Sequence, residues 1–154
     1  MKDAVHELAF DGALLTRGFW LYVWEITKPD STRLYYVGRT GDSSSSNPQS
    51  PFNRMSAHLS FNRNNNILRR YLEGKQVKVE LCSFRLLAHG PLLKGARSKY
   101  ETRRDIIAAL EKALADAMRE AGYNVINVVY GRKPLDAKRF ASVRSIFSGY
   151  FPAL

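Results

Sequence analysis

An acidic residue on the apolar face of a predicted helix is the first feature of this sequence that suggests chemistry. A helix is predicted over residues 96–121, and each residue of a helix is rotated by about 100° from the one before it. The apolar residues that then lie within about 60° of Ile107 form one stripe: Ile107, Leu110, Leu114, Met118 and Ala121. Glu111 falls inside that stripe, and no basic residue stands three or four positions from it, whereas Lys112 and Asp116 form an ordinary i,i+4 pair. Burying a carboxylate costs free energy unless a positive charge compensates it. Glu111 is therefore either paired with a basic residue from another element, or a metal ligand or catalytic carboxylate.

Two groups that can bind phosphate stand four residues apart in the segment "PFNRMSAHL", residues 51–59. Proline is favoured in the first turn of a helix, so a helix is predicted over 51–62. Arg54 and His58 then share one face of this helix, opposite the apolar face formed by Phe52, Met55 and Leu59. The pair either acts on a substrate or consists of two solvated side chains.

Two tyrosines lie in segments that are rich in aromatic and β-branched residues, "FWLYVWEIT" at 19–27 and "RLYYVG" at 33–38. The turn formers in "KPDST" between them predict a β-hairpin, which would bring Tyr22 and Tyr36 to one region of the sheet. Packing in the core is the simpler interpretation for most aromatic residues in strands. Gly38 has no side chain and would permit a close approach by a phosphate or by another backbone.

The remaining pattern predicts the elements that must position these residues. A second helical segment is expected at 65–75 and a third strand at 77–85, where apolar and polar residues alternate. Glycines and a proline at 90–95 are expected to break the chain before the long helix, which Gly122 ends, and a short extended segment follows at 123–131. The order β-β-α-α-β-α-β-α indicates an α+β fold with a small sheet covered by helices. A chain of 154 residues suits one domain, 1–154.

The segment 132–154 combines basic residues, among them Lys133 and Arg139, with apolar residues at helical spacing: Phe140, Val143, Ile146 and Phe147. Such spacing is typical of a helix that packs on the core or on a second subunit. A clamp that holds DNA is the alternative interpretation.

The composition limits the kinds of partner that the protein is expected to bind. The chain has 24 Lys and Arg against 14 Asp and Glu, a formal net charge of +10, and a surface this positive attracts polyanions such as nucleic acid. The first residues, "MKDAVHELAF", form neither a signal peptide nor a membrane span, so we expect no membrane association and a cytoplasmic location. The single cysteine, Cys82, excludes a disulfide within the chain and is expected to be a small core residue.

Taken in order, these segments resemble the GIY-YIG nuclease family over about residues 19–129. The resemblance lies in "LYV" (21–23), "YVG" (36–38), "RMSAH" (54–58), the glutamate of "LEKALADAMREAGYNVIN" and the asparagine that ends it. Trp20 and Leu21 replace the Gly-Ile of the first motif, and the serine-rich stretch 42–50, read as a loop, lengthens the gap between Gly38 and Arg54.

The resemblance implies a small, largely antiparallel three-stranded sheet flanked by helices. It also implies an endonuclease that hydrolyses phosphodiester bonds of nucleic acid, DNA rather than RNA being favoured, with one Mg²⁺ or Mn²⁺ ion. The family's catalytic residues correspond here to Tyr22, Tyr36, Arg54, His58, Glu111 and Asn127. Glu111 would be the metal ligand, and Asn124 competes with Asn127 for the last role. Arg39 follows the motif glycine, where a basic residue can contact nucleic acid, as Lys133 and Arg139 of the tail would.

Tyrosine is a weak base, with a pKa near 10 in its free form, and nearby cations would bring Tyr22 closer to a useful range. Tyr22 is the favoured general base, with Tyr36 orienting water or phosphate, and His58 is the competing base. A basic module that binds nucleic acid without cleaving it is the main alternative to the nuclease, and a structural protein is a third. A homodimer that cuts both strands is compatible with the sequence.

Overall fold

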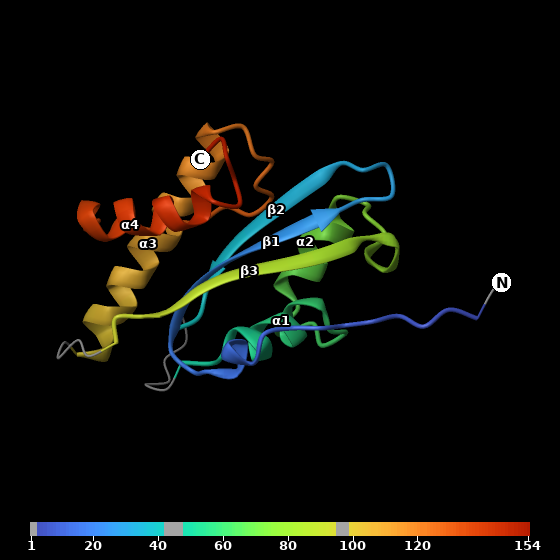
Figure 1. Cartoon of the computed structure of the whole chain (residues 1–154), viewed down its shortest axis with the longest axis horizontal. Coiled ribbons are helices and arrows are strands. Elements are labelled where there is room, and N and C mark those ends of the chain that lie inside the picture. Colours follow the sequence, from blue (N-terminus) through green and yellow to red (C-terminus); the bar gives the residue numbers. More distant parts are fainter. Residues whose placement is uncertain (1–2, 42–47, 95–98) are drawn as a thin grey trace.

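Three antiparallel strands form the sheet, in the order β2-β1-β3 (Figure 1). The computed structural model describes residues 3–41, 48–94 and 99–154. Strand β1 spans Phe19–Thr27, β2 spans Arg33–Arg39 and β3 spans Ser83–Leu92. In the β1-β2 hairpin Tyr22 is opposite Gly38 and Trp24 is opposite Tyr36. The predicted hairpin is therefore confirmed, and its register carries both phenols on one face of the sheet.

Within the described ranges four α-helices surround the sheet, which confirms the predicted α+β class. They are α1 (Pro51–Leu59), α2 (Ile67–Gly74), α3 (Tyr100–Glu120) and α4 (Ala137–Ser148), with short 3-10 helices at Gly12–Leu15 and Val79–Leu81. Ser50 caps α1 by accepting a hydrogen bond from the Asn53 backbone, and Pro51 occupies its first turn. Of the helices in these ranges, none is both long and apolar enough to cross a membrane.

The two faces of the sheet are covered by different helices (Figure 1). Leu21, Val23 and Val37 pack with α3 and α4, and we call this the α3 side. The alternate residues of the same strands, including Tyr22, Trp24 and Tyr36, pack with α1 and α2 on the α1 side. Successive side chains of a strand point to opposite faces, so each half of the core is read from every second residue.

The prediction for the third strand was wrong in its position. Residues 77–85 were expected to be extended, but 79–81 form a 3-10 turn and the strand runs from Ser83 to Leu92. Gly90 and Pro91 lie inside β3 instead of ending it. An edge strand tolerates both, because one side of its backbone has no ladder partner, and the β1-β3 register shifts near this end.

The helical predictions hold with shorter bounds. The long helix begins at Tyr100 instead of 96, and the expected break at Gly95 and the bulk of the loop 42–50 lie outside the described residues. Ala121 and Cys82 are half-buried, so neither is a full core residue. The tail helix packs on α3 with Val143 and Phe147 in the core, as expected, whereas Ile146 faces outward.

Candidate functional site

Tyr22, Tyr36 and His58 form one buried cluster on the α1 side. The Tyr22 hydroxyl lies 3.3 Å from His58 Nε2, at hydrogen-bonding distance. The imidazole meets both phenol rings edge to face, with ring centroids 5.8 Å from Tyr22 and 5.3 Å from Tyr36. The three side chains are only 2%, 7% and 1% exposed in the order Tyr22, Tyr36, His58. Residues 36 positions apart therefore meet in one largely buried cluster.

The predicted orientation of α1 was wrong for His58. The apolar pattern placed Arg54 and His58 on the face away from the core, yet His58 is buried and Arg54 is half-buried. Helix α1 packs on the α1 side of the sheet and also contacts the N-terminal segment, where the Phe52 ring meets Phe10 with centroids 4.8 Å apart. A helix covered on two sides buries more than its apolar face, and a histidine can join the buried side when a phenol hydrogen-bonds it.

Gly38 has no room for a side chain because the Tyr22 ring, and not a ligand, occupies the space beside it. A Cβ atom at this position would lie 2.5 Å from the ring and hydroxyl of Tyr22. The sequence suggested that a phosphate or another backbone uses this space, and the structure corrects this to the Tyr22 ring. The glycine therefore sets where the Tyr22 hydroxyl lies.

Glu111 has a basic partner from another element. Arg39 Nη1 donates to Glu111 Oε2 at 2.7 Å, and the two side chains are 18% and 13% exposed. Of the two explanations for an acid on the apolar stripe, the tertiary ion pair is present in this structure. Arg39, predicted as a phosphate contact, is thus part of the same site as Glu111.

The charges that act on Tyr36 connect the Tyr22–His58 cluster with the Arg39–Glu111 ion pair. Burial raises the pKa of the Tyr36 phenol well above its usual range, the charges of Tyr22 and Glu111 raise it further, and Arg54 acts in the opposite direction. Tyr36 therefore keeps its proton near neutral pH and can donate a hydrogen bond, but it is no base. The same interactions place Tyr22, Arg54 and Glu111 within electrostatic reach of one phenol.

Asn127 holds the open edge of β2. Its Oδ1 accepts from the Val37 backbone N–H at 3.0 Å and its Nδ2 donates to the Val37 carbonyl at 2.7 Å. The side-chain amide thereby extends a short parallel pairing in which Tyr35 exchanges backbone hydrogen bonds with Asn124 and Ile126. Asn127 is buried and Asn124 is exposed, so the supporting position belongs to Asn127.

Sequence reasoning missed Arg119 and Tyr71. Arg119 Nη2 donates to the Asn127 carbonyl at 2.7 Å and so anchors the Asn127 segment to α3. The Tyr71 ring on α2 meets Tyr36 at a centroid distance of 6.0 Å. Neither contact could be found from spacing, because each joins a helix to a segment that only the fold brings near.

The remaining predicted residues lie at the surface. Lys133 pairs with Asp105 at 3.3 Å and Arg139 with Asp136 at 3.2 Å, each with a side chain about half exposed. Arg54 borders a polar hollow of about 570 Å³ together with Asn53, Ser56 and Asn62. Of the predicted nucleic-acid contacts, only Arg39 joins the Glu111 group.

The donor set suits a hard divalent ion that keeps most of its waters. The described residues contain no group of three or more His, Cys, Asp or Glu side chains that could hold an ion. Glu111 is the carboxylate beside the tyrosines, and Mg²⁺ is commonly held by one or two carboxylates together with waters and substrate oxygens. The residues fit Mg²⁺ bound in that way, and they do not fit a zinc site built from protein ligands.

Comparison with known proteins identifies no relative. No family model matches the chain, and neither the curated proteins nor the solved structures contain a significant match.

Proposed function

We propose that this protein is a metal-dependent endonuclease of the GIY-YIG type that hydrolyses phosphodiester bonds in nucleic acid, with DNA as the favoured substrate. The observation that carries the proposal is the Tyr22–His58 hydrogen bond beside a phenol, Tyr36, that is acted on by both Arg54 and Glu111. A base, a phosphate-binding cation and a metal-binding carboxylate are the parts that this hydrolysis needs.

Tyr22 and His58 together can take a proton from water. With the imidazole proton on Nδ1, His58 Nε2 accepts from the Tyr22 hydroxyl and makes the phenol oxygen more basic. The two residues that compete as general base on sequence alone then act as one unit, in which Tyr22 contacts the water and His58 draws its proton.

Arg39 and Arg54 can bind the phosphate. A guanidinium donates two hydrogen bonds to a phosphate and offsets charge that develops in the transition state. Arg39 is held by Glu111 at 2.7 Å, so a substrate phosphate would exchange for the carboxylate. Glu111 would then be the residue that holds Mg²⁺, which when bound stabilises negative charge on the phosphate oxygens.

Plasmid cleavage tests the proposal. Purified protein is incubated with supercoiled DNA and Mg²⁺ or Mn²⁺, and nicked and linear products are quantified. Glu111→Gln is expected to reduce the rate by about a hundredfold or more, the usual loss when a charge-stabilising group is removed. Glu120→Gln, which changes an exposed glutamate of the same helix, is expected to cut like the wild type. Intact DNA with every divalent ion tried, or full activity of Glu111→Gln, would overturn the proposal.

A module that binds nucleic acid without cleaving it is the second candidate. It is favoured by the Arg39–Glu111 ion pair, which neutralises the carboxylate, and by the burial of Tyr22 and His58. Both candidates predict binding that weakens steeply with salt. Affinity without turnover in the same plasmid assay would favour the binding module.

A further inference from the structure

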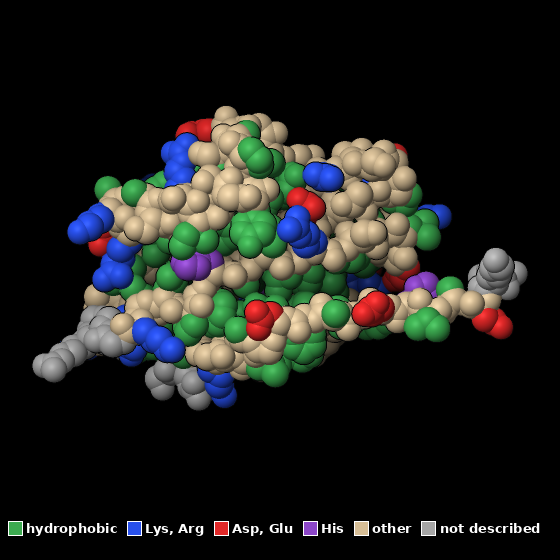
Figure 2. All heavy atoms as spheres, viewed as in Figure 1, with side chains coloured by type: hydrophobic (Ala, Val, Ile, Leu, Met, Phe, Trp, Pro, Cys, Tyr) green, Lys and Arg blue, Asp and Glu red, His purple; other side chains and the backbone are tan. Residues whose placement is uncertain are grey.

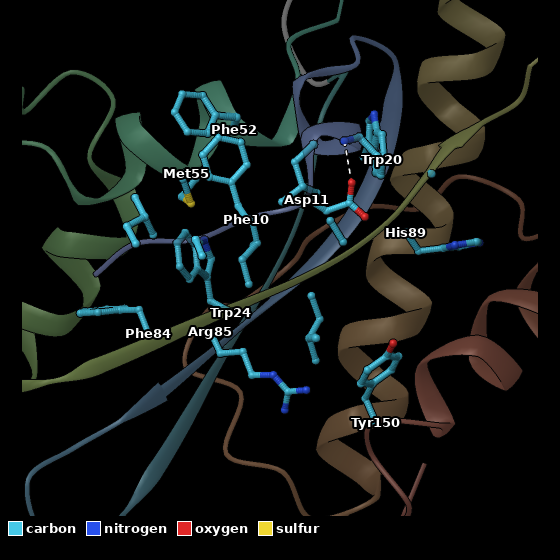
Figure 3. Close-up of a pocket in the computed structure, with 18 of the residues that line it drawn as sticks. Phe10, Asp11, Trp20, Trp24, Phe52, Met55, Phe84, Arg85, His89 and Tyr150 are labelled. Carbon is cyan, nitrogen blue, oxygen red and sulfur yellow. Dashed lines mark hydrogen bonds between the residues drawn. The ribbon is translucent and has the colours of Figure 1, made fainter. Parts of the chain in front are cut away.

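A second, apolar site lies apart from the tyrosine cluster. The N-terminal segment and β3 enclose an open groove of about 960 Å³, visible as a green-floored hollow in Figure 2 and in close-up in Figure 3. Its walls are largely apolar and aromatic: Leu8, Phe10, Trp24, Phe52, Met55 and Phe84. None of the residues assigned to the candidate nuclease site lines it.

Trp24 in this groove has a polar atom with no partner. The side chain is 3% exposed, and its indole N–H meets no acceptor within the described part of the chain. A buried donor without an acceptor is unfavourable, because it has lost its hydration and gained no hydrogen bond. In Figure 3 the indole lies between Phe10, Met55 and Phe84, and these side chains must shift before an acceptor on a molecule in the groove reaches the N–H.

The groove also runs along an unpaired strand edge. Strand β3 is the last strand of the sheet, and no strand among the described residues pairs with its outer side. Such an edge offers a row of backbone donors and acceptors to an added strand. An extended peptide would satisfy this edge, cover the apolar walls and supply a carbonyl for Trp24.

The N-terminal segment is a peptide of this kind. Residues 3–10 have no regular secondary structure and project beyond the sheet in Figure 1, and we call them the arm. Val5 is 98% exposed and Leu8 is 74% exposed. The arm carries Asp3 and Glu7 in a chain of net charge +10, and Arg85 lies in the groove. Apolar side chains with acidic neighbours therefore match an apolar groove with a basic residue.

We propose that the groove binds residues 3–7 of the arm of a second copy of this chain, while residues 8–10 of its own arm remain as one wall, and that two copies insert these ends into one another's grooves about a twofold axis. The arm and β3 run in the same direction along the two sides of the groove (Figure 1). A twofold axis reverses the second arm, which then runs antiparallel to β3, the orientation of the existing sheet. Each copy gives one arm and receives one, so the interface closes as a dimer.

The oligomeric state of the full chain tests the proposal. Sedimentation or light scattering over a range of concentrations is expected to show a dimer. Ala4→Asp combined with Val5→Asp should raise the dimer dissociation constant by about a hundredfold or more, because two apolar side chains that do not line the chain's own groove lose their burial in the partner. Leu81→Asp with Val128→Asp is the matched control, since both residues are more than half exposed and lie outside the groove. Circular dichroism verifies that all variants are folded.

Cross-linking tests the contact directly. In a Cys82→Ser background, Val5→Cys protein is mixed with Ala88→Cys protein and oxidised. Peptide mass spectrometry is expected to find a disulfide between positions 5 and 88, which in this mixture can join only two different copies. Substituting Trp24→Phe should weaken the dimer several-fold by removing the N–H. A monomer at every concentration, or a dimer that the arm substitutions weaken no more than the control pair does, would overturn the proposal.

Discussion

The two sides of one small sheet differ in chemistry although they alternate along the same strands. On the α3 side Leu21, Val23 and Val37 pack against aliphatic residues of α3, and each is fully buried. On the α1 side the adjacent positions of the same strands are Tyr22, Trp24 and Tyr36, equally buried but carrying polar atoms. Because successive side chains point to opposite faces, nine residues of β1 serve both a dry core and a polar cluster.

This difference affects how much each side contributes to stability. Apolar burial stabilises the fold without directing any chemistry, whereas a buried hydroxyl or imidazole contributes less because it must first lose its hydration. Burial on the α1 side therefore contributes less to the free energy of unfolding than burial on the α3 side, and the α1 side holds Tyr22, His58 and Trp24 in defined positions. The arm groove and the Tyr22–His58 part of the proposed nuclease site use residues of this side, whereas Arg39 and Glu111 belong to the α3 side.

The largest expected effect compares one residue from each side. Leu114→Ala on the α3 side should lower the free energy of unfolding by about 2–5 kcal/mol, since it leaves a cavity in a fully buried position. Tyr22→Phe should lower it by about 1 kcal/mol, through loss of the hydrogen bond to His58, yet reduce cleavage by about a hundredfold or more. Urea unfolding and plasmid cleavage measure the two effects. If Leu114→Ala and Tyr22→Phe lower the free energy of unfolding equally, and Tyr22→Phe cleaves DNA like the wild type, then the two sides of the sheet do not differ in this way.

An intermediate effect is expected where β2 passes over Tyr22. Gly38→Ala places a methyl group 2.5 Å from the ring and should lower the free energy of unfolding by about 1–3 kcal/mol while it displaces the hydroxyl. Gly74→Ala is the control, because nothing lies within 4 Å of a Cβ at that position. Thermal melts and cleavage rates are compared. If Gly38→Ala melts and cuts like Gly74→Ala, then the Tyr22 ring does not depend on this glycine.

The smallest effect is a pH dependence at Tyr36. Burial raises the pKa of this phenol in the folded protein, so the folded state holds the proton more tightly than the unfolded chain does. The resulting stability is fully present below about pH 10, where the unfolded phenol titrates, and is lost as the pH rises above it. Urea unfolding between pH 8 and 11 should therefore show the wild type losing stability relative to Tyr36→Phe only at the alkaline end. A constant difference across this range would contradict the raised pKa.

The fold was predictable where local pattern and pairing agree. The hairpin followed from aromatic strands around a proline turn, and the buried stripe of α3 from apolar residues at helical spacing, with Ile107 and Leu114 in the core. The third strand was misplaced because alternation at Val77, Val79 and Leu81 resembles a strand, whereas Val79 lies in a 3-10 turn. Pairing with β1, which selects residues 83–92, is not visible in a local window.

Local pattern was enough to find the hairpin, the helices and the acid on the α3 stripe, since these depend on neighbours within one or two turns. The contacts between distant residues were set by the packing of the elements. They join Glu111 with Arg39 across 72 positions, Tyr22 with His58 across 36, and Asn127 with Val37 across 90. The physical reason is that periodicity assigns a residue to a face of its own element, whereas the partner on that face is chosen when whole elements pack together. His58 illustrates this, because the pattern of its helix points it outward and the packing of that helix on Tyr22 and Tyr36 of the sheet buries it.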